Sequence, residues 1–595
     1  MIKRMFFIVF SCLLPLILFS QNNTIKGLTT DENAEPLIGV NIVVKGKTIG
    51  TVSDVQGNYI INAQPGEILV FSYIGYQSIE VPITQNVINV ILKEDVTYLD
   101  EVVAIGYGSQ KRSNVTNAIS TIKGEDLISR GTGSADEALI GKVAGVRVMQ
   151  MDGMPGRGMD IKVRGISSIN FSNNPLYVID GFPVDNLRSV TTGDIESIEV
   201  LKDAASTAIY GSRGSQGVIL ITTKRGAKGK PVVQLNTDLI VQRPWSKINV
   251  LNRDEWIEFA IEERNNTYEL NGGDRNNDNS KRAAAYQIDP LWLTDPTSLP
   301  DHDWYDITTR NALMQKYQLS VSGATDDVKY YISSNWLDQP GVVLYTDFNR
   351  LSFTSNVEGS VKDFLSIGVN LNASQEEQND PQTSSNAAGV SRIQLTPPVI
   401  GLEQNTENGG YYPYAGSFII NPLAQLRDET RFHKTRKIRA NVYADVKFTS
   451  EFKLRSSFGA YLNNSTTQQY IMANLTRGKG SSGFAESTEN TNYLTEHVLS
   501  YEKLFKDIEF GAIGGFSYQE NSFYSIYAAR SGFADDQVKT LNAGTDMTGA
   551  SSSMNKWTMM SFFTRLNVAY KNRYLGYISL RRDGSSRFGK DSKWG

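Results

Sequence analysis

The chain has 595 residues, of which 40% are hydrophobic, 10% aromatic and 21% charged. This length supports several large cores, and the composition excludes collagen, a disulfide-rich small domain and wholesale disorder. The formal net charge of −4 argues against a general nucleic-acid binder, because affinity for phosphates depends on an excess of Lys and Arg.

The amino terminus has the pattern of a secretory signal peptide. A basic start precedes an apolar run from Met5 to Phe19, and the small residue Ser20 follows. We therefore expect residues 1–20 to be cleaved. The only cysteine, Cys12, lies in this segment, so the mature chain would have no disulfide framework, Cys-based zinc site or catalytic thiol.

The pattern of residues 22–94 predicts a small β-sandwich. Short runs rich in Val and Ile alternate there with turn signals such as Gly57-Asn58 and Pro65-Gly66. Residues 95–111 follow as a linker with an apolar centre. This centre is compatible with one more edge strand, or with an extended segment that adds a strand to the sheet of a partner protein.

Residues 112–229 have a mixed α/β pattern. The segment Ser134–Glu137 is a capping box that predicts a short helix, and Asp203 can cap a second helix, which Gly211 ends. Four further segments are strand candidates, at residues 159–165, 175–181, 195–201 and 217–223.

From residue 230 onward the pattern changes, and separate segments appear in which apolar and polar residues alternate. In residues 437–448 one face is apolar, with Ile438, Ala440, Val442, Ala444, Val446 and Phe448. The other face is polar, with Lys437, Arg439, Asn441, Asp445 and Lys447, and with Tyr443 as the one exception. Roughly eleven such segments recur, each near the ~9–11 residues of a tilted membrane strand.

This alternation predicts an antiparallel barrel, although a soluble sandwich or propeller also alternates. Short turns such as Ser450-Glu451 and long polar connections such as residues 375–430 favour a barrel in an outer membrane. Aromatic residues near strand ends favour it too, namely Tyr317, Tyr330, Tyr331, Tyr570 and Tyr574. In the connection at residues 252–263, the spacing of Trp256, Phe259 and Ala260 predicts a short amphipathic helix that packs locally.

Several long motifs resemble the SusC-like family of TonB-dependent outer-membrane transporters. Residues 31–59 resemble the carboxypeptidase-regulatory-like domain that precedes the transporter. Three segments resemble the plug, at residues 155–165, 173–185 and 194–226, and two resemble the barrel, at residues 315–343 and 578–590.

The resemblance implies the domain order of the chain. Residues 22–94 would be the regulatory-like β-sandwich and residues 112–229 the α/β plug domain. Residues 230–595 would be part of an antiparallel transmembrane β-barrel of about 22 strands. Because these residues supply only about half of such a barrel, we expect the sequence to be the amino-terminal part of a longer protein.

The resemblance also implies the residues of two sites. The linker at residues 95–111 sits where the family carries its TonB box, and the candidate residues are Leu99, Asp100, Glu101, Val102, Val103, Ala104, Ile105, Gly106 and Tyr107. The plug motifs supply Arg164, Gly165, Asp180, Gly181, Asp203, Tyr210 and Gly211.

The implied function is active import of a nutrient across the outer membrane of a Gram-negative, Bacteroidota-type bacterium. Oligosaccharide is the favoured cargo, with peptide as the alternative. The implied partners are TonB with the ExbB/ExbD energy-transducing complex, a SusD-like surface lipoprotein as a lid, and outer-membrane lipid. Two rival functions stay open: a non-catalytic surface adhesin or glycan-binding protein, and a secreted glycan-active enzyme with a β-sandwich accessory domain.

The sequence predicts no catalytic residue, cofactor or metal. No pair of carboxylates can be assigned acid and base roles. Asp301, His302 and Asp303 could look like metal ligands, but three consecutive loop residues seldom converge on one ion. The charged plug residues are expected to meet polar residues of the barrel lumen or to be solvated there, and they are Arg157, Lys162, Arg164, Asp180, Asp185 and Arg213.

Overall fold

The structure is a computed structural model that forms two compact units, residues 1–102 with 111–113 and residues 103–110 with 114–595. It describes residues 24–595 except 33, 48, 74–75, 94–101, 105, 107–108, 112–118, 129–132, 151–152, 167, 171, 382–389, 404–420, 477–479, 572 and 590. The expected signal peptide therefore lies outside the described residues. Each unit is described by itself.

The first unit is a sandwich of two small sheets. The strand order is β4-β1-β7 in one sheet and β3-β2-β5-β6 in the other. Their bounds are β1 Thr24–Thr30, β2 Asn41–Val44, β3 Gly50–Val52, β4 Asn58–Asn62, β5 Ile68–Ser72, β6 Ile79–Pro82 and β7 Val90–Ile91. Alternate residues of both sheets point into one core, in which the rings of Tyr59 and Phe71 meet edge to face at 5.3 Å.

The second unit contains a small α/β domain, residues 119–223, which we call the plug. Its five-stranded sheet has the order β10-β15-β16-β13-β14, and β11 and β12 form a separate pair. Its strands are β10 Ile119–Lys123, β11 Val146–Gln150, β12 Met159–Val163, β13 Leu176–Ile179, β14 Phe182–Val184, β15 Ile195–Leu201 and β16 Val218–Thr223. The four strand candidates from the sequence are confirmed as β12, β13, β15 and β16.

One plug hairpin has a turn that follows directly from its sequence. Asp180 and Gly181 join β13 to β14, and their φ angles are 50° and 87°. A two-residue hairpin loop of this kind needs positive φ at both positions, which Asp-Gly adopts readily. The tip of this hairpin is therefore a tight, well-defined projection.

The helices of the plug are short, α2 Gly124–Ile128 and α3 Ala204–Thr207. Asp203 caps α3 as predicted, since its side chain accepts a hydrogen bond from the Ser206 N–H at 2.6 Å. The predicted helix after Ser134 is wrong, because only a 3-10 turn forms at Glu137–Leu139. The Glu137 carboxylate accepts a hydrogen bond from the N–H of Gly133 at 2.8 Å, so its side chain holds the preceding loop.

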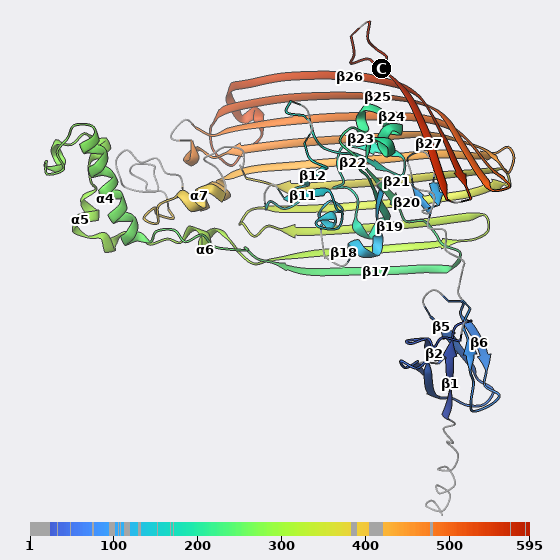
Figure 1. Ribbon diagram of the computed structural model, residues 1–595. Coiled ribbons are helices and arrows are strands. Elements are labelled where there is room, and N and C mark those ends of the chain that lie inside the picture. The colour runs from blue at the N-terminus through green and yellow to red at the C-terminus, as the bar shows by residue number, and fades with distance from the viewer. Residues whose placement is uncertain are drawn as a thin grey trace, which may run out of the picture. The chain divides into compact units, whose positions relative to one another are not determined.

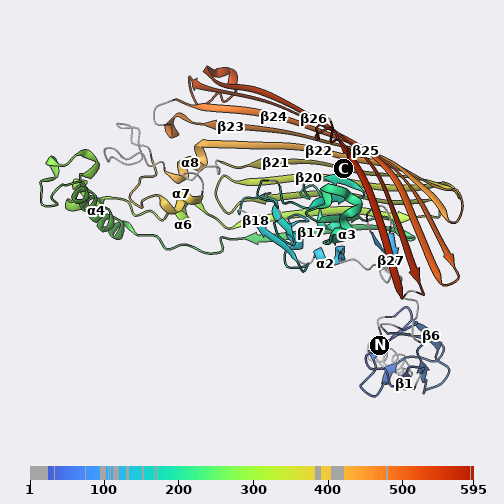
Figure 2. The same cartoon turned by 45° about the horizontal axis from the view of Figure 1, so that its top comes forward.

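The rest of this unit is one antiparallel sheet of 11 strands in sequence order, which we call the wall. Its strands are β17 Gly229–Gln242, β18 Ala312–Ala324, β19 Val328–Pro340, β20 Asp347–Lys362, β21 Leu365–Asn379, β22 Glu429–Lys447, β23 Phe452–Ile471, β24 Ser482–Phe505, β25 Ile508–Phe533, β26 Gly544–Tyr570 and β27 Tyr574–Ser585. The wall is curved, and the plug lies against its concave face (Figures 1 and 2).

The wall strands are longer than the sequence predicted. They have 12 to 27 residues. Polar segments that break the alternation, such as residues 482–492, stay hydrogen-bonded to the neighbouring strands and so lengthen each strand. The expected length of ~9–11 residues covers only the part of each strand with a continuous apolar face.

The two faces of the wall have an inverted pattern of burial. On β22, Lys437 and Arg439 are only 5% and 6% exposed, whereas Ile438 and Val442 are 45% and 46% exposed. The charged face therefore points toward the plug and the aliphatic face points outward. This arrangement is the reverse of a soluble domain, in which the aliphatic face would form the core.

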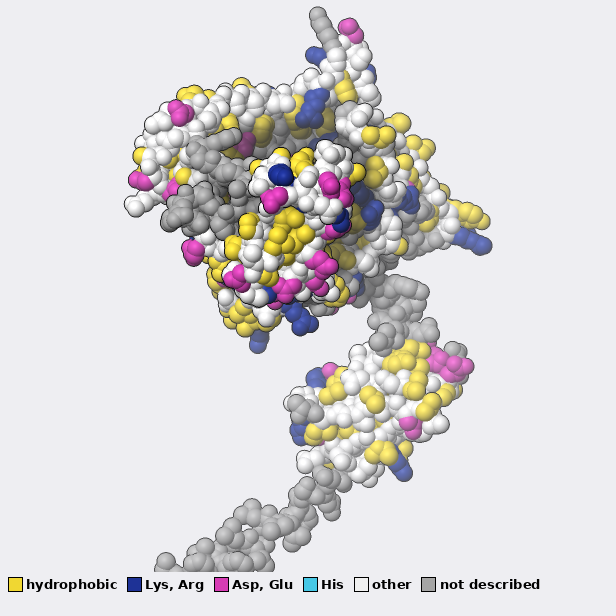
Figure 3. Space-filling view, turned by 90° about the vertical axis from the view of Figure 1, so that its left-hand side faces the viewer, with side chains coloured by type: hydrophobic (Ala, Val, Ile, Leu, Met, Phe, Trp, Pro, Cys, Tyr) yellow, Lys and Arg dark blue, Asp and Glu magenta, His cyan; other side chains and the backbone are white. Residues whose placement is uncertain are grey.

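The long connections form a small folded cap at one end of the wall, and short turns such as residues 448–451 lie at the other end (Figure 1). The cap contains α4 Arg253–Leu270, α5 Pro290–Thr294, α6 Trp304–Thr308, α7 Val390–Leu395 and α8 Pro422–Asp428 around one hydrophobic cluster. Hydrophobic and acidic side chains both reach the surface at this end (Figure 3). No helix among the described residues is long and apolar enough to cross a bilayer.

The predicted amphipathic helix in this cap is confirmed as the start of α4, which Asn252 and Glu255 open with a capping box. Trp256 packs edge to face on Trp292, with ring centroids 5.3 Å apart. The prediction for Phe259 is wrong, because its side chain is 61% exposed.

Candidate functional site

The candidate site is the interface between the plug and the inward face of the wall. The densest contact is made by Asp194, which ends a 3-10 turn at Thr192–Asp194 and is buried. One carboxylate oxygen accepts hydrogen bonds from Gln318, Tyr331 and Ser333 at 2.7–2.9 Å. The other oxygen accepts from Thr354 at 2.9 Å and from Asn335 at 3.2 Å.

These five donors are neutral side chains from β18, β19 and β20. A buried carboxylate is unfavourable unless hydrogen bonds replace its water shell, and a carboxylate offers about four lone-pair sites. The wall therefore supplies a complete polar shell for this one charge. We call this contact the Asp194 anchor.

The backbone beside Asp194 fits the wall equally closely. A Cβ atom on Gly193 would lie 1.8 Å from Gln318 Oε1, so a larger residue would displace the amide that binds Asp194. The amide of Gln318 thus lies against Gly193 and binds Asp194.

A second contact joins Gly211 of the plug to β27, the last strand of the wall. This residue has a φ of 62°, and a Cβ atom there would lie 2.1 Å from Asp583 Oδ2 on β27. Arg581 pairs with Asp583 at 2.7 Å and also donates to the carbonyl of Ile209. Glycine is therefore required both by the backbone conformation and by the close approach of β27.

Tyr210, next to this glycine, is buried in a cluster that includes Val498, Ile513 and Phe563 of the wall. Burial raises the pKa of its hydroxyl above the usual range. Arg213 follows on the same segment and donates a hydrogen bond to Gln519 of β25. The segment at residues 209–213 therefore forms an anchor on β25 to β27.

Further polar contacts lie toward the cap. Arg157 pairs with Asp380 at 2.8 Å, and Gln378 donates to the carbonyl of Pro155 at 2.7 Å. Arg350 of β20 donates to the carbonyls of Arg188 and Gly133. These contacts hold the loops of the plug that face the cap.

The β13–β14 hairpin touches the wall differently. The carboxylate of Asp180 is held inside the plug, where it accepts from the N–H and hydroxyl of Thr223 at 3.0 and 2.8 Å. Toward the wall, Asp180 meets Arg439 at 3.8 Å, and its carbonyl accepts from Asn441 at 3.4 Å. These two contacts are long for polar interactions.

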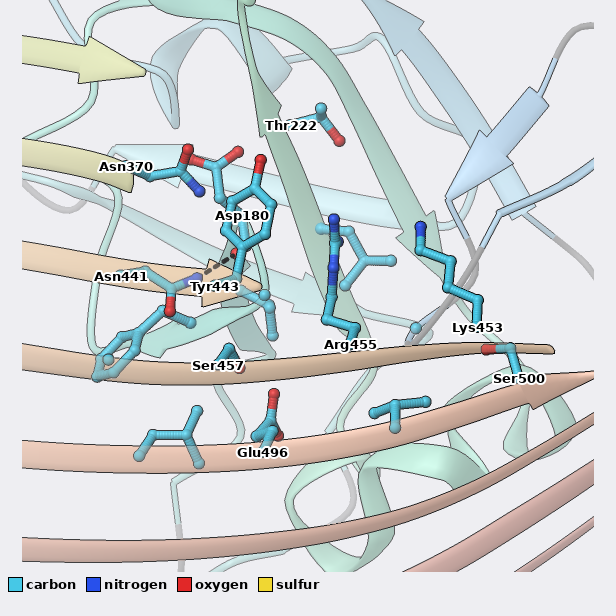
Figure 4. A pocket seen from close by; sticks show the side chains of 18 of the residues that line it. Asp180, Thr222, Asn370, Asn441, Tyr443, Lys453, Arg455, Ser457, Glu496 and Ser500 are labelled. Carbon is cyan, nitrogen blue, oxygen red and sulfur yellow. Dashed lines mark hydrogen bonds between the residues drawn. The ribbon is translucent and has the colours of Figure 1, made fainter. Parts of the chain in front are cut away.

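A cavity of about 580 Å³ lies beside this hairpin, between the plug and β21 to β24. Its polar lining comes from both sides of the interface and includes Asp180, Thr222, Asn370, Asn441, Tyr443, Lys453, Arg455, Ser457, Glu496 and Ser500 (Figure 4). The turn at Thr449–Glu451 also lines the cavity, which therefore extends to the short-turn end of the wall.

The plug residues implied by the sequence do not form one site. Asp180 and Gly181 form the hairpin tip, Asp203 caps α3, and Tyr210 and Gly211 contact the wall. Arg164 and Gly165 lie apart from these, in an exposed turn after β12 where their φ angles are 55° and 105°. Lys162 pairs with Asp160 inside the plug.

Much of the TonB box candidate lies outside the described residues, namely Leu99, Asp100, Glu101, Ile105 and Tyr107. The segment Val102–Ala104 is a strand, β8, which pairs with β9 at Ser109–Lys111. Gly106 between them has a φ of 69° and lines the cavity.

The side chains of Asp301 and Asp303 accept hydrogen bonds from backbone N–H groups. Asp301 accepts from the N–H of Arg253, and Asp303 caps α6 by accepting from Tyr305 and Asp306. Among the residues that the structure describes, no group of three or more His, Cys, Asp or Glu side chains could hold a metal ion.

Comparison with known proteins gives matches along the whole chain. Residues 111–218 match the TonB-dependent receptor plug domain, and residues 25–104 match the CarboxypepD_reg-like domain. TonB-dependent receptor P3 of Formosa agariphila is 32% identical over 98% of this chain and 57% of its own length. TonB-dependent receptor SusC of Bacteroides thetaiotaomicron is 32% identical over 100% of this chain and 60% of its own length.

The chain thus spans 57–60% of the length of these two relatives. Among solved structures, the RagAB peptide importer in the open-open state is similar with a TM-score of 0.71. The match has 22% identity and covers 83% of this chain and 57% of that chain, so it shows a shared fold.

We predict that Asp194→Ala lowers the stability of the plug by about 3–5 kcal/mol, because five buried donors lose their acceptor. The matched control is Glu196→Ala, because Glu196 lies two residues away and its side chain is exposed. This substitution should change stability by no more than about 0.5 kcal/mol. Thermal unfolding and protease cleavage within residues 119–223 measure the effect. Equal stability of the two variants would contradict the anchor.

We also predict that Gly211→Ala weakens the seating of the plug by about 1–3 kcal/mol, since the new methyl group meets Asp583. Gly141→Ala is the control, because Gly141 also has a positive φ, 68°, but no atom within 4 Å of a new Cβ. The difference between the two unfolding midpoints measures what the site of Gly211 demands beyond a positive φ. A loss for Gly141→Ala as large as for Gly211→Ala would show that the contact with β27 contributes little.

Proposed function

The chain is homologous, over almost all of its length, to the TonB-dependent receptors of the SusC type, and we propose that it imports a nutrient across the outer membrane. The sequence-based expectation of this family and of its fold class is thereby confirmed. In this proposal the wall belongs to a transmembrane barrel of about 22 strands, and the plug closes its lumen.

The observation that carries the proposal is the inverted burial of the wall. Aliphatic residues such as Ile438 and Val442 are exposed on the outer face, and lysine and arginine are buried on the inner face. A lipid bilayer accepts the first face, and a polar plug accepts the second. A surface adhesin or a secreted glycan-active enzyme requires no such plug, so transport is the better explanation.

Opening such a pore requires work on the plug, because Asp194 is saturated with hydrogen bonds to the wall and the segment at residues 209–213 is packed against it. We propose that TonB supplies it by pairing with residues 99–107 as an added strand and pulling, powered through the ExbB/ExbD complex. The extended conformation of Val102–Ala104 supports this role. Because β8 is already paired with β9, TonB would add to its other edge or replace β9.

The cargo and the outer partner are proposed from the relatives. The resemblance of the sequence motifs to the SusC-like family favours an oligosaccharide, and the similar RagAB structure is described as a peptide importer, so peptide is the alternative. A SusD-like surface lipoprotein would bind over the cap, where hydrophobic side chains such as Leu293 and Leu395 are exposed. Growth of a deletion strain on a panel of oligosaccharides and peptides separates the two cargo classes.

We predict that deletion of residues 99–108 abolishes uptake and leaves binding of the cargo at the cell surface intact, because only the pulling site is lost. Val103→Pro should act like the deletion, since proline removes a backbone N–H and resists strand pairing. Val103→Thr is the matched control and should keep uptake, because it retains the N–H and strand propensity.

The measurement compares accumulation and surface binding of the best substrate from the growth panel. Uptake at the normal rate in the deletion strain would contradict the TonB assignment, and loss of surface binding would show that the deletion damages the fold.

A further inference from the structure

Alternate side chains of two neighbouring wall strands line the cavity. On β23 every second side chain points inward, and Lys453, Arg455, Ser457 and Gly459 line the cavity in turn. On the neighbouring β24, the facing residues Ser500, Val498, Glu496 and Leu494 line it in the same order. The cavity is therefore a shaft that runs from the short-turn end toward the middle of the wall.

The shaft ends where the hairpin tip meets the wall. Phe182, the first residue of β14, is buried against Tyr461 and Leu494, and Tyr461 is the next inward residue after Gly459. The Phe182 and Tyr461 rings lie 6.4 Å apart. A Cβ atom on Gly459 would lie 2.4 Å from Phe182 Cδ2, so the phenyl ring fills the notch that this glycine leaves.

The seal at Phe182 contrasts with the anchors on either side of it. The Asp194 anchor on β18 to β20 has five hydrogen bonds of 2.7–3.2 Å. The hairpin tip has an apolar contact and two polar contacts of 3.4 and 3.8 Å. Displacing it separates Arg439 from Asp180, but the carboxylate of Asp180 stays satisfied because it keeps its hydrogen bonds to Thr223 within the plug.

The other end of the shaft is close to the linker. Gly106, within the TonB box candidate, lines the same cavity, and a Cβ atom there would lie 2.8 Å from Ile209 Cγ2. Withdrawal of this segment would enlarge the open end of the shaft. The linker and the seal therefore lie at opposite ends of one space.

We propose that the tip of the β13–β14 hairpin, with Phe182 as its seal, is the gate of the pore, and that solute passes between this hairpin and β22 to β24. The Asp194 anchor holds the plug to β18–β20 while the gate moves. This inference rests on the proposed transport function, but it concerns the route and not the energy source.

The first test measures passive leak, which needs neither TonB nor a known cargo. The full-length protein is purified from its host's membranes and placed in a planar lipid bilayer, and the probe is potassium ion in potassium chloride. Phe182→Ala should raise the resting current by at least an order of magnitude over the unaltered protein.

The matched control is Phe348→Ala. Phe348 of β20 presses on the plug at Gly156 just as Phe182 presses on the wall at Gly459, since a Cβ atom on Gly156 would lie 2.2 Å from its ring. Phe348→Ala should leave the current unchanged, because it lies on the anchored side. An equal leak from both variants, or no leak from correctly folded Phe182→Ala, would overturn the proposed route.

A second test closes the gate reversibly. Phe182→Cys with Gly459→Cys should leak when reduced and seal when oxidised, because a disulfide replaces the aromatic contact. The control pair is Gly156→Cys with Phe348→Cys on the anchored side, where a Cβ atom on Gly156 would lie 2.2 Å from the Phe348 ring, and its current should not respond to oxidation. Residues 21–595 contribute no competing thiol, since Cys12 is the only cysteine among the 595 residues, and any cysteine elsewhere in the full-length protein is first replaced by serine.

Leak that persists after cross-linking of residues 182 and 459, confirmed by a gel shift, would contradict the gate. Failure of the proposed function gives a different result, namely energised uptake that does not depend on residues 99–108. The leak experiments and the uptake experiment therefore fail independently.

Discussion

The burial of polar side chains against other polar side chains is the interaction on which the rest of the structure depends. The inner face of the wall carries charges that could not be buried alone, such as Lys437, which pairs with Glu376 at 2.9 Å while both side chains are almost fully buried. The plug completes this set of partners at Asp194. Because the inner face is satisfied in this way, the outer face is free to be aliphatic.

The polar contacts are unevenly distributed around the plug, and this unevenness has a mechanical consequence. Hydrogen bonds with many partners resist displacement because each lost bond leaves a buried group unsatisfied. Asp194 is held in this way, and the segment at Tyr210–Arg213 is held by apolar packing of Tyr210 together with hydrogen bonds from Arg213 to Gln519 and from Arg581 to the Ile209 carbonyl. The hairpin tip between them is held by packing and by long contacts, so a pulling force would displace it before the anchored parts.

Much of the fold follows from local patterns, whereas the interface does not. Alternation assigned the correct faces of β22, and it did so because side chains of a strand alternate regardless of what lies on either side. The helix predicted from the capping box at Ser134–Glu137 is wrong because such a motif marks only a starting point, and a single 3-10 turn follows it at Glu137–Leu139. The prediction that Phe259 packs locally is wrong because helical spacing does not reveal how wide the apolar stripe of the helix is.

The roles of Asp194 and Phe182 could not be predicted, because their partners lie more than 100 residues away in sequence. A glycine at an inward position of an alternating strand, as at Gly459, is the one local signal of a close approach. As site residues, Asp180 and Gly211 are singled out only by the family resemblance. In the structure, Asp180 forms a tight turn with positive φ, and Gly211 combines a positive φ with a close approach to Asp583.

The most direct measurement is the environment of single spin labels on β22 and β23 in lipid vesicles. A nitroxide at Val442→Cys should collide more with oxygen, which concentrates in lipid, than with a water-soluble nickel chelate. A nitroxide at Ser457→Cys, which lines the cavity, should show the opposite preference. A preference for the nickel chelate at both positions would contradict a wall with lipid on one side and a plug on the other.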